Sequence, residues 1–344
     1  MILAAGIGAT GPPRAQALAP TPAYAPCADS NNFACGHVRV PIDRTGATPG
    51  TITLALRRHR APVGEARDAV IALAGGPGQA ALPFAEQFAS VLGPIIATRD
   101  LIVFDQRGTG LSDPLSCRGV GSSSGGGREG PAIAACAAKI GRARPFFTTD
   151  QSVADIEAIR QAGGYEKLIL YGTSYGTKVA ERYAQSYPTH VEGLVLDSVV
   201  PPNGPDPLNR STFAAVPRVL RQLCAGRACR RVTHSPRTDL MRLVRRIGPR
   251  GLRAHWIDGH GRPRAIKISS DDVLEALLAG DMEPGLRAEF PAAVLSAARG
   301  DDAALARMLE RAESAEASEL EAGGFDAALD LDTSCEEQSF PWNR

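Results

Sequence analysis

The segment Leu168–Thr177 contains the residue with the clearest chemical potential, a serine between two glycines. Its sequence, LILYGTSYGT, predicts a buried strand, a sharp turn with the pattern G-x-S-x-G, and the start of a helix. A serine on such a turn presents its hydroxyl at the carboxyl end of a sheet, where a base can reach it. Gly172 and Gly176 are needed because the turn brings backbones too close for side chains. The sequence therefore predicts that Ser174 is a nucleophile, with a structural serine as the alternative.

A second glycine-rich turn, Gly75–Gly78, directly follows the apolar run Ala69–Ala74. That run predicts a strand covered on both faces, lying beside the nucleophile strand. In this arrangement the turn supplies one backbone N–H to an oxyanion hole, and the residue after the serine supplies the other. The predicted donors are Gly76 and Tyr175, and an ordinary Gly/Pro turn is the alternative.

Three further charged residues follow strand ends. Asp105 and Arg107 come just after the apolar run Leu101–Phe104. We expect them to form an Asp–Arg pair that braces the loop beside the oxyanion turn, because a catalytic acid normally follows the nucleophile in the chain. The alternative makes Asp105 the catalytic acid. Asp197, after the strand Val191–Leu196, is a second candidate acid, with loop bracing as its structural interpretation.

A serine hydroxyl becomes a good nucleophile when a histidine accepts its proton and an acid orients that histidine. The chain has six histidines: His37, His59, His190, His234, His255 and His260. The first two fall in early strands, the third opens the strand before Asp197, and the last three fall in a helix-rich region. Any of them would need a rearranged fold to serve as the base, so the sequence offers no clear partner for Ser174.

The elements that position these residues alternate between strands and helices up to about residue 200. His37–Asp43 and Thr51–His59 alternate in hydrophobicity and predict two strands joined by a Gly/Pro turn. Gln151–Gln161 has apolar residues at helical spacing, with Asp150 as the expected N-cap. This alternation predicts a mostly parallel α/β sheet.

The pattern changes after Pro201–Pro205. Amphipathic stretches predict helices over 214–224, 239–247, 271–278 and 303–312, and a hairpin is expected within 254–268. We therefore divide the chain into a flexible leader or signal remnant (1–26), an α/β core (27–204), a helical cap (205–330) and the start of a return to the core (331–344). Residues 118–130 are of low complexity and predict a mobile surface loop.

Composition excludes some classes of function and favours export. The formal net charge of +1 gives no electrostatic argument for binding nucleic acid or a membrane surface, and no cofactor or metal is expected. Six of seven cysteines form three sequence-local pairs that are typical of disulfides made in an oxidising compartment: Cys27–Cys35, Cys117–Cys136 and Cys224–Cys229. Cys335 is left over. Zinc is disfavoured because no histidine lies at ligand spacing beside these pairs.

Four motifs in order resemble one family. AGGPG at 74–78, VFDQRGTGLSDP at 103–114, YGTSYGT at 171–177 and VLDSVVPP at 195–202 are similar to the proline iminopeptidase and tripeptidyl aminopeptidase group of α/β-hydrolases. The flanking residues Val40–Asp43 and the cysteine pairs resemble the secreted tripeptidyl aminopeptidases in particular. Ala74 stands where many relatives have histidine, which leaves a backbone donor unaffected.

The resemblance implies an α/β-hydrolase fold with a helical cap, and a secreted serine exopeptidase that acts on peptides with a free N-terminus. Glu336 and Glu337 are candidate partners for the substrate ammonium group, with surface carboxylates as the alternative. In the family the catalytic Asp and His follow the cap on the last two strands, where this chain ends. We therefore expect the N-terminal part of a longer enzyme, with little or no turnover by itself. A carboxylesterase-type hydrolase and a non-catalytic binding remnant are the alternatives.

Overall fold

A computed structural model describes residues 21–64, 66–121, 130–203, 210–280, 283–322 and 324–338. These residues form two compact units, the first made of the described residues up to 203 together with 324–338, the second of those between 210 and 322. Most of the expected leader, part of the low-complexity segment and the last six residues lie outside the described residues.

The first unit is built around a seven-stranded sheet with the order β1-β2-β3-β5-β4-β6-β7. The strands are β1 (Ala25–Pro26), β2 (Ala34–Pro41), β3 (Thr51–His59), β4 (Ala69–Leu73), β5 (Asp100–Phe104), β6 (Leu168–Thr173) and β7 (Val191–Asp197). β1, β2, β3 and β5 pair antiparallel, whereas β5, β4, β6 and β7 are parallel. The expected mostly parallel α/β sheet with the strand of Ala69–Leu73 beside the nucleophile strand is confirmed.

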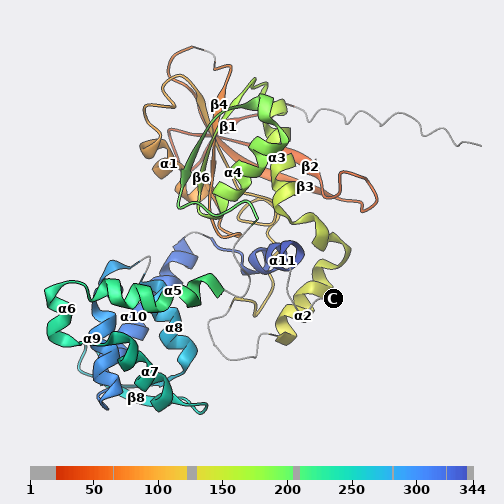
Figure 1. Ribbon diagram of the computed structural model, residues 1–344. Helices are drawn as coiled ribbons and strands as arrows, with labels where there is room; N and C mark the ends of the chain where they lie inside the picture. The colour runs from red at the N-terminus through yellow and green to blue at the C-terminus, as the bar shows by residue number, and fades with distance from the viewer. Residues whose placement is uncertain are drawn as a thin grey trace, which may run out of the picture. The chain divides into compact units, whose positions relative to one another are not determined.

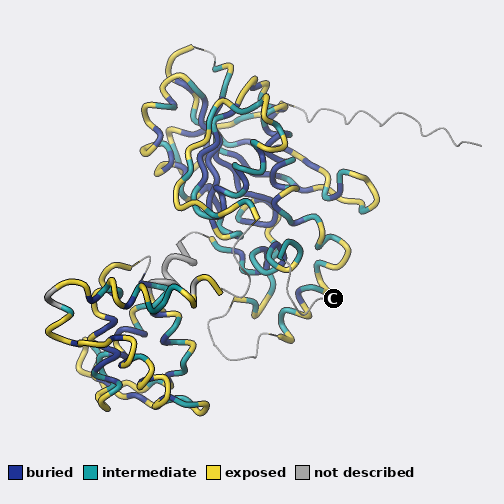
Figure 2. Tube along the Cα trace, viewed as in Figure 1, coloured by how far each residue is buried: buried dark blue, intermediate teal, exposed yellow. Residues whose placement is uncertain are grey.

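The helices of the first unit include α1 on one face of this sheet and α3 and α4 on the other (Figure 1). They are η1 (Leu82–Phe84), α1 (Ala85–Val91), α2 (Gly130–Ile140), η2 (Gly141–Phe146), α3 (Thr149–Gly163), α4 (Tyr175–Ser186), η3 (Pro188–His190) and α11 (Ala327–Glu337). The central strands β4, β5 and β6 are mainly apolar, since alternate side chains enter two cores. Ile71 and Leu170 pack with α3 and α4, whereas Val70 and Tyr171 pack with α1. Figure 2 shows the resulting buried centre.

One expected helix cap is wrong. α3 begins at Thr149, two residues before the expected Gln151, so Asp150 lies within its first turn rather than at the N-cap. Thr148 occupies the N-cap with extended backbone angles, φ −118° and ψ 166°, and makes no side-chain cap hydrogen bond. The carboxylate of Asp150 instead accepts a hydrogen bond from Arg182 on α4. In the first turn it still complements the positive end of the helix dipole.

The second unit is mainly helical and has its own core. Its elements are α5 (Arg210–Leu223), α6 (Arg227–Val232), α7 (Pro236–Ile247), β8 (Leu252–Ile257), β9 (Pro263–Ile268), α8 (Ser270–Ala279), α9 (Pro284–Ala298) and α10 (Ala303–Ala322). β8 and β9 form the expected hairpin. A core that includes Leu243, Trp256, Phe290 and Leu305 holds them together. The chain has returned to the first unit by Phe325, against 331 in the division made from the sequence.

Covalent links within the units follow the cysteine pattern. The structure contains the disulfides Cys27–Cys35, Cys117–Cys136 and Cys224–Cys229, and Cys335 is an exposed free thiol. Among the described residues, no helix combines the length and apolar character required to cross a bilayer.

Candidate active site

Ser174 lies on a strained turn between β6 and α4. Its backbone angles are φ 53° and ψ −121°, in a region that non-glycine residues rarely adopt. The backbone N–H of Ser174 donates to the carbonyl oxygen of Asp197 at the end of β7, at 2.9 Å. The turn is therefore tied to the neighbouring strand, which holds the serine at the carboxyl edge of the parallel strands. Strain of this kind is common at functional sites.

The two glycines of the motif allow the backbones to meet. A Cβ atom on Gly172 would lie 2.5 Å from the carbonyl oxygen of Gly176. A Cβ atom on Gly176 would lie 2.6 Å from the carbonyl oxygen of Leu73 in β4. Both distances are shorter than any real Cβ contact, so a side chain at either position would push the turn apart. The close approach expected from the sequence is present.

Thr177 stabilises the turn, a role that sequence analysis missed. It is fully buried, and its hydroxyl donates to the carbonyl oxygen of Ser174 at 2.6 Å. The hydroxyl oxygen of Thr177 in turn accepts the backbone N–H of Val200 at 2.8 Å. Thr177 thus links the turn to the loop after β7. Its position one residue beyond the G-x-S-x-G pattern was the available signal, but its partner Val200 is distant in sequence.

The Gly75–Gly78 turn lies beside the serine hydroxyl. A Cβ atom on Gly75 would lie 3.1 Å from Cβ and 3.5 Å from Oγ of Ser174. The N–H of Gly75 donates to Oε1 of Gln79 at 3.3 Å. Among the described residues, the N–H groups of Gly76 and Tyr175 have no hydrogen-bond acceptor. Tyr175 directly follows Ser174 in the chain, and Gly76 directly follows Gly75. Free backbone donors near a serine hydroxyl are what a developing oxyanion requires.

Phe325 and Asp326, where the chain re-enters the first unit, contact the Gly75–Gly78 turn and the residue after it. The N–H of Asp326 donates to the carbonyl oxygen of Gly78 at 2.8 Å, and Gln79 pairs with Phe325 in an isolated β-bridge. Gly78 has φ 106°, and a Cβ atom there would lie 2.4 Å from the carbonyl oxygen of Asp326. Residues distant in sequence therefore fix the shape of the turn, which the sequence alone could not indicate.

Asp105 braces the same region through backbone contacts. Its Oδ1 accepts the N–H groups of Ala81 and Leu82 at 2.7 and 2.9 Å, and its Oδ2 accepts that of Leu111 at 2.9 Å. Burial raises the pKa of this carboxyl, and the three N–H donors oppose that shift. Asp105 thus joins the loop after β5 to the segment after the Gly75–Gly78 turn, as the bracing interpretation expects.

The expected partner of Asp105 is wrong, because Arg107 pairs with another acid. The guanidinium of Arg107 forms two hydrogen bonds to Asp155 on α3, both at 2.6 Å. It also donates to the carbonyl oxygens of Ile42 and Phe146. Asp155 accepts a further bond from Arg44. Both members of the Arg107–Asp155 pair are buried. Asp105 and Arg107, which the sequence predicted to pair, therefore stabilise different parts of the unit.

Two of the three histidines of the first unit, His190 and His59, lie at the edge opposite to Ser174. His190 precedes β7 and thus lies at the opposite end of the parallel strands, where its Nδ1 is 3.2 Å from Glu157. His59 ends β3, which runs antiparallel, and is paired with Leu101 at the same opposite end.

His37 lies on β2, four strand positions from β6, or about 19 Å at the usual strand spacing. Among the described residues of the first unit, no histidine reaches Ser174.

The carboxylates proposed from the sequence already have partners. Asp197 is exposed, and its Oδ1 accepts a hydrogen bond from Ser198 at 3.0 Å. Glu336 pairs with Arg144 at 2.5 Å. Glu337 pairs with Lys178 at 2.5 Å and accepts the hydroxyl of Thr149 at 2.9 Å. These contacts hold α11 against η2, α3 and α4 within the first unit, so both glutamates already have cationic or hydroxyl partners.

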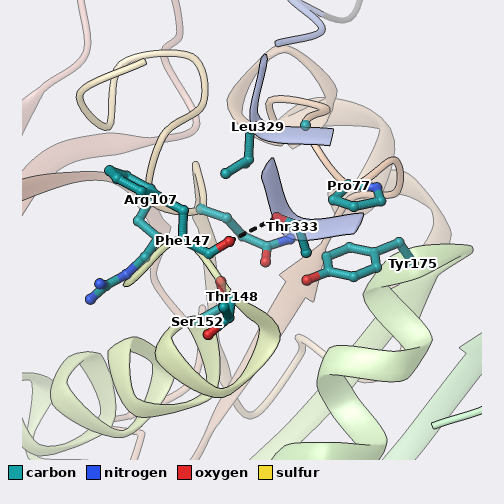
Figure 3. A pocket seen from close by; sticks show the side chains of 10 residues that line it. Pro77, Arg107, Phe147, Thr148, Ser152, Tyr175, Leu329 and Thr333 are labelled. Carbon is teal, nitrogen blue, oxygen red and sulfur yellow. Dashed lines mark hydrogen bonds between the residues drawn. The ribbon is translucent and has the colours of Figure 1, made fainter. Parts of the chain in front are cut away.

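Tyr175 anchors the residue after the serine in a polar network. Its hydroxyl lies 2.8 Å from Oγ1 of Thr149, which in turn donates to Glu337. Burial raises the pKa of Tyr175, and the charge of Glu337 adds to that shift. The ring borders a cavity of 10 Å³ together with Pro77 and Thr333 (Figure 3). This volume holds about one water molecule and is too small for a peptide side chain.

The described residues contain no cluster of three His, Cys, Asp or Glu side chains that could hold a metal ion. The arrangement at Ser174 suits covalent acyl transfer, in which a hydroxyl attacks a carbonyl and backbone donors stabilise the oxyanion.

Asp332 on α11 is expected to make the docking of this helix depend on pH. Its Oδ2 is buried without a hydrogen-bond partner, and burial raises its pKa to about 6, with a further contribution from Glu336. The folded state therefore binds the proton of the Asp332 carboxyl more tightly than the unfolded chain does. Protonation of Asp332 stabilises the fold at low pH, and this contribution to the free energy of unfolding is lost as pH rises through about 6. Asp332→Asn is expected to raise stability at pH 8 by about 1 kcal/mol. Urea denaturation at pH 4 and pH 8 measures the difference.

At pH 4 the two proteins should have nearly equal midpoints, because the wild-type carboxyl is then largely protonated in the fold. Burial also raises the pKa of Asp330 to about 6, but this residue is present in both proteins and its effect cancels in the comparison. An equal gain from Asp332→Asn at both pH values would contradict the assignment.

Comparison with known proteins identifies the family. A family model described as the alpha/beta hydrolase fold matches residues 68–251, which is more than half of the chain. The chain therefore belongs to the α/β-hydrolase family. This agrees with the strand order, the Ser174 turn and the turn at Gly75–Gly78.

Three curated relatives have peptidase names. A tripeptidyl aminopeptidase of Streptomyces coelicolor is 32% identical over 191 residues, which cover 49% of this chain and 35% of the relative. Serine protease Hip1 of Mycobacterium tuberculosis is 30% identical over 212 residues, 54% of this chain and 40% of the relative. A proline iminopeptidase of Neisseria gonorrhoeae is 32% identical over 130 residues, 38% and 32% of the two chains. Each match thus spans well under half of the relative.

Proposed function

We propose that this chain provides the nucleophile and the oxyanion donors of a secreted serine exopeptidase. Its substrates are peptides with a free N-terminus, from which it releases single residues or tripeptides. The observation that carries the proposal is Ser174, strained at the edge of the sheet beside two free backbone N–H groups. The peptidase names of the relatives support a peptide substrate. The division into a hydrolase core and a helical cap belongs to this proposal.

In the proposed reaction, Oγ of Ser174 attacks the carbonyl carbon of the scissile peptide bond. The carbonyl oxygen becomes an oxyanion that accepts hydrogen bonds from the N–H groups of Gly76 and Tyr175. The tetrahedral intermediate collapses as the amine leaves, and an acyl-enzyme on Ser174 remains. Water then hydrolyses the ester, which restores the hydroxyl.

The proton of Ser174 needs an acceptor that returns it to the leaving amine. Among the described residues of the first unit no histidine reaches it, so we place the base elsewhere in the protein. The three disulfides support an oxidising compartment and thus export.

A substrate panel tests this function. We expect arylamides of tripeptides with a free amine to be cleaved at least about tenfold faster than their N-acetylated forms, because recognition of a charged group makes the difference. Rates are measured with and without added imidazole, which substitutes for a histidine base. Ser174→Ala is the control and should lose the activity. Equal rates on free and acetylated substrates, or cleavage of simple aryl esters alone, would contradict the exopeptidase.

A further inference from the structure

The second unit separates its charges along the chain, which the small net charge of the whole protein conceals. Residues 210–267 contain 15 Arg and Lys against 2 Asp and no Glu, a formal charge of +13. Residues 271–322 contain 4 Arg against 13 Asp and Glu, a formal charge of −9. α5, α6, α7 and the β8–β9 hairpin are thus strongly basic, and they precede acidic helices.

α7 presents basic and apolar side chains together on its solvent face. Asp239, Leu243 and Ile247 lie on its buried face. The opposite face carries Arg237, Met241, Val244 and Arg245, all of them exposed. Their sequence spacings of four, three and one residues place them on one side of a helix. Met241 is 48% and Val244 39% exposed. Two large apolar residues in water between arginines are unusual on a helix that already buries its own apolar face.

The neighbouring basic elements repeat this combination. Phe213 on α5 is 51% exposed, and the same segment carries the exposed Arg218 and Arg221. On α6, Val232 is exposed next to Arg231. α5 and α7 pack against each other, so their basic side chains lie in the same part of the second unit.

The hairpin has an exposed face of the same kind. Arg253 and Ile257 alternate with the buried Ala254 and Trp256 on β8, and Lys267 is paired with Arg253 across the hairpin. Ile257 is 57% exposed.

Few of these cations are neutralised by acids of the described chain. Arg246 pairs with Asp302, Arg242 with Asp239, and Arg264 with Glu310. The exposed arginines at 221, 230, 231, 237, 245 and 253 have no carboxylate partner among the described residues. A surface with this many arginines lacking a carboxylate partner attracts an anionic partner.

We propose that α5, α6, α7 and the β8–β9 hairpin form a surface that binds the anionic headgroups of a lipid bilayer. The arginines contact the phosphates, and Phe213, Val232, Met241, Val244 and Ile257 enter the boundary with the acyl chains. Peripheral binding of this kind needs basic and apolar side chains on one surface, with each basic residue contributing to attraction. This goes beyond the proposed peptidase function and revises the expectation drawn from net charge.

The exposed apolar residues favour a lipid surface over a nucleic acid. Phosphate contacts with nucleic acids come from Arg, Lys and polar groups, and base contacts from polar or stacking side chains. Aliphatic residues such as Met241, Val244 and Ile257 gain nothing in water next to a phosphate backbone. In a bilayer interface they are removed from water, which is favourable.

The test is flotation of the full chain with vesicles of neutral phosphatidylcholine, with or without phosphatidylglycerol. We expect binding to the anionic vesicles alone, weakened as salt is raised. Arg237→Glu with Arg245→Glu should weaken it at least tenfold. Met241→Ser with Val244→Ser should also weaken it severalfold without changing charge. Arg299→Glu with Arg307→Glu is the charge-matched control and should bind as wild type does, because these exposed residues lie at the C-cap of α9 and on α10.

Other results would overturn the proposal. Binding to anionic vesicles that the Ser variant leaves unchanged would mean a polyanion site, and preferential binding to a short DNA duplex would indicate a nucleic acid. Concentration-dependent self-association that outcompetes vesicles would assign the basic surface to the acidic helices of a second copy. Equal loss in the α9–α10 control would mean a response to net charge. Circular dichroism checks that all variants are folded.

Discussion

Replacing Asp155 with alanine is expected to destabilise the first unit by about 3–5 kcal/mol, the largest effect on stability that we predict. The change leaves the guanidinium of Arg107 buried with only the carbonyl oxygens of Ile42 and Phe146 as partners. A buried charge without its counter-ion costs far more than the ion pair contributes. Denaturation in guanidinium chloride, followed by far-UV circular dichroism, measures the decrease in the free energy of unfolding.

Two further variants test whether the unpaired charge of Arg107 causes the loss. The double variant Arg107→Met with Asp155→Leu removes both charges and should be more stable than Asp155→Ala alone. Glu166→Ala breaks the exposed pair with Arg67 and should leave the unfolding midpoint unchanged. If the double variant were no more stable than Asp155→Ala, the unpaired buried charge would not be the cause.

Replacing Ser174 with glycine is expected to remove acylation while stabilising the fold. The hydroxyl is the proposed nucleophile, so covalent labelling by a fluorophosphonate or an activated ester should fall to background. Glycine adopts the observed φ of 53° without the steric cost that serine bears, which should raise the free energy of unfolding by about 1 kcal/mol. Intact mass spectrometry and chemical denaturation measure the two effects on the same protein.

Ser186 provides a matched control because it ends α4 in ordinary helical conformation. Ser186→Gly should destabilise by roughly 0.5–1 kcal/mol and leave labelling unchanged. Ser174→Ala should lose labelling without the full gain in stability, since alanine keeps a Cβ atom. A loss of stability in Ser174→Gly similar to that in Ser186→Gly would refute the strained turn.

Local patterns were sufficient for the fold around Ser174. Buried parallel strands need continuous apolar runs, and a sharp turn into a helix needs glycines, so Ala69–Leu73 and Leu168–Gly176 could be assigned from neighbouring residues alone. The disulfide pairs were also local in sequence. The α/β-hydrolase family followed from these motifs in order.

Partners that are distant in sequence could not be assigned in this way. The sequence paired Asp105 with Arg107 because they are two residues apart, but burial placed Arg107 against Asp155 on α3. The contacts of Thr177 with Val200 and of Gly78 with Asp326 likewise depend on how elements pack. The net charge of the whole chain hides the local excess of arginines in the second unit. The structure shows that many of these arginines are exposed on α5, α6, α7 and the β8–β9 hairpin.

The sequence by itself determined the class of fold, the turn that holds Ser174 and the cysteine pairs, because each depends on residues adjacent in the chain. The tertiary structure decided which N–H groups beside Ser174 are free, which acid Arg107 meets and that no first-unit histidine reaches Ser174 among the described residues. These are properties of burial and strand direction. A hydrogen bond or ion pair forms only where packing brings the two groups together. The hydrophobic periodicity of one segment does not indicate which distant residues it will contact.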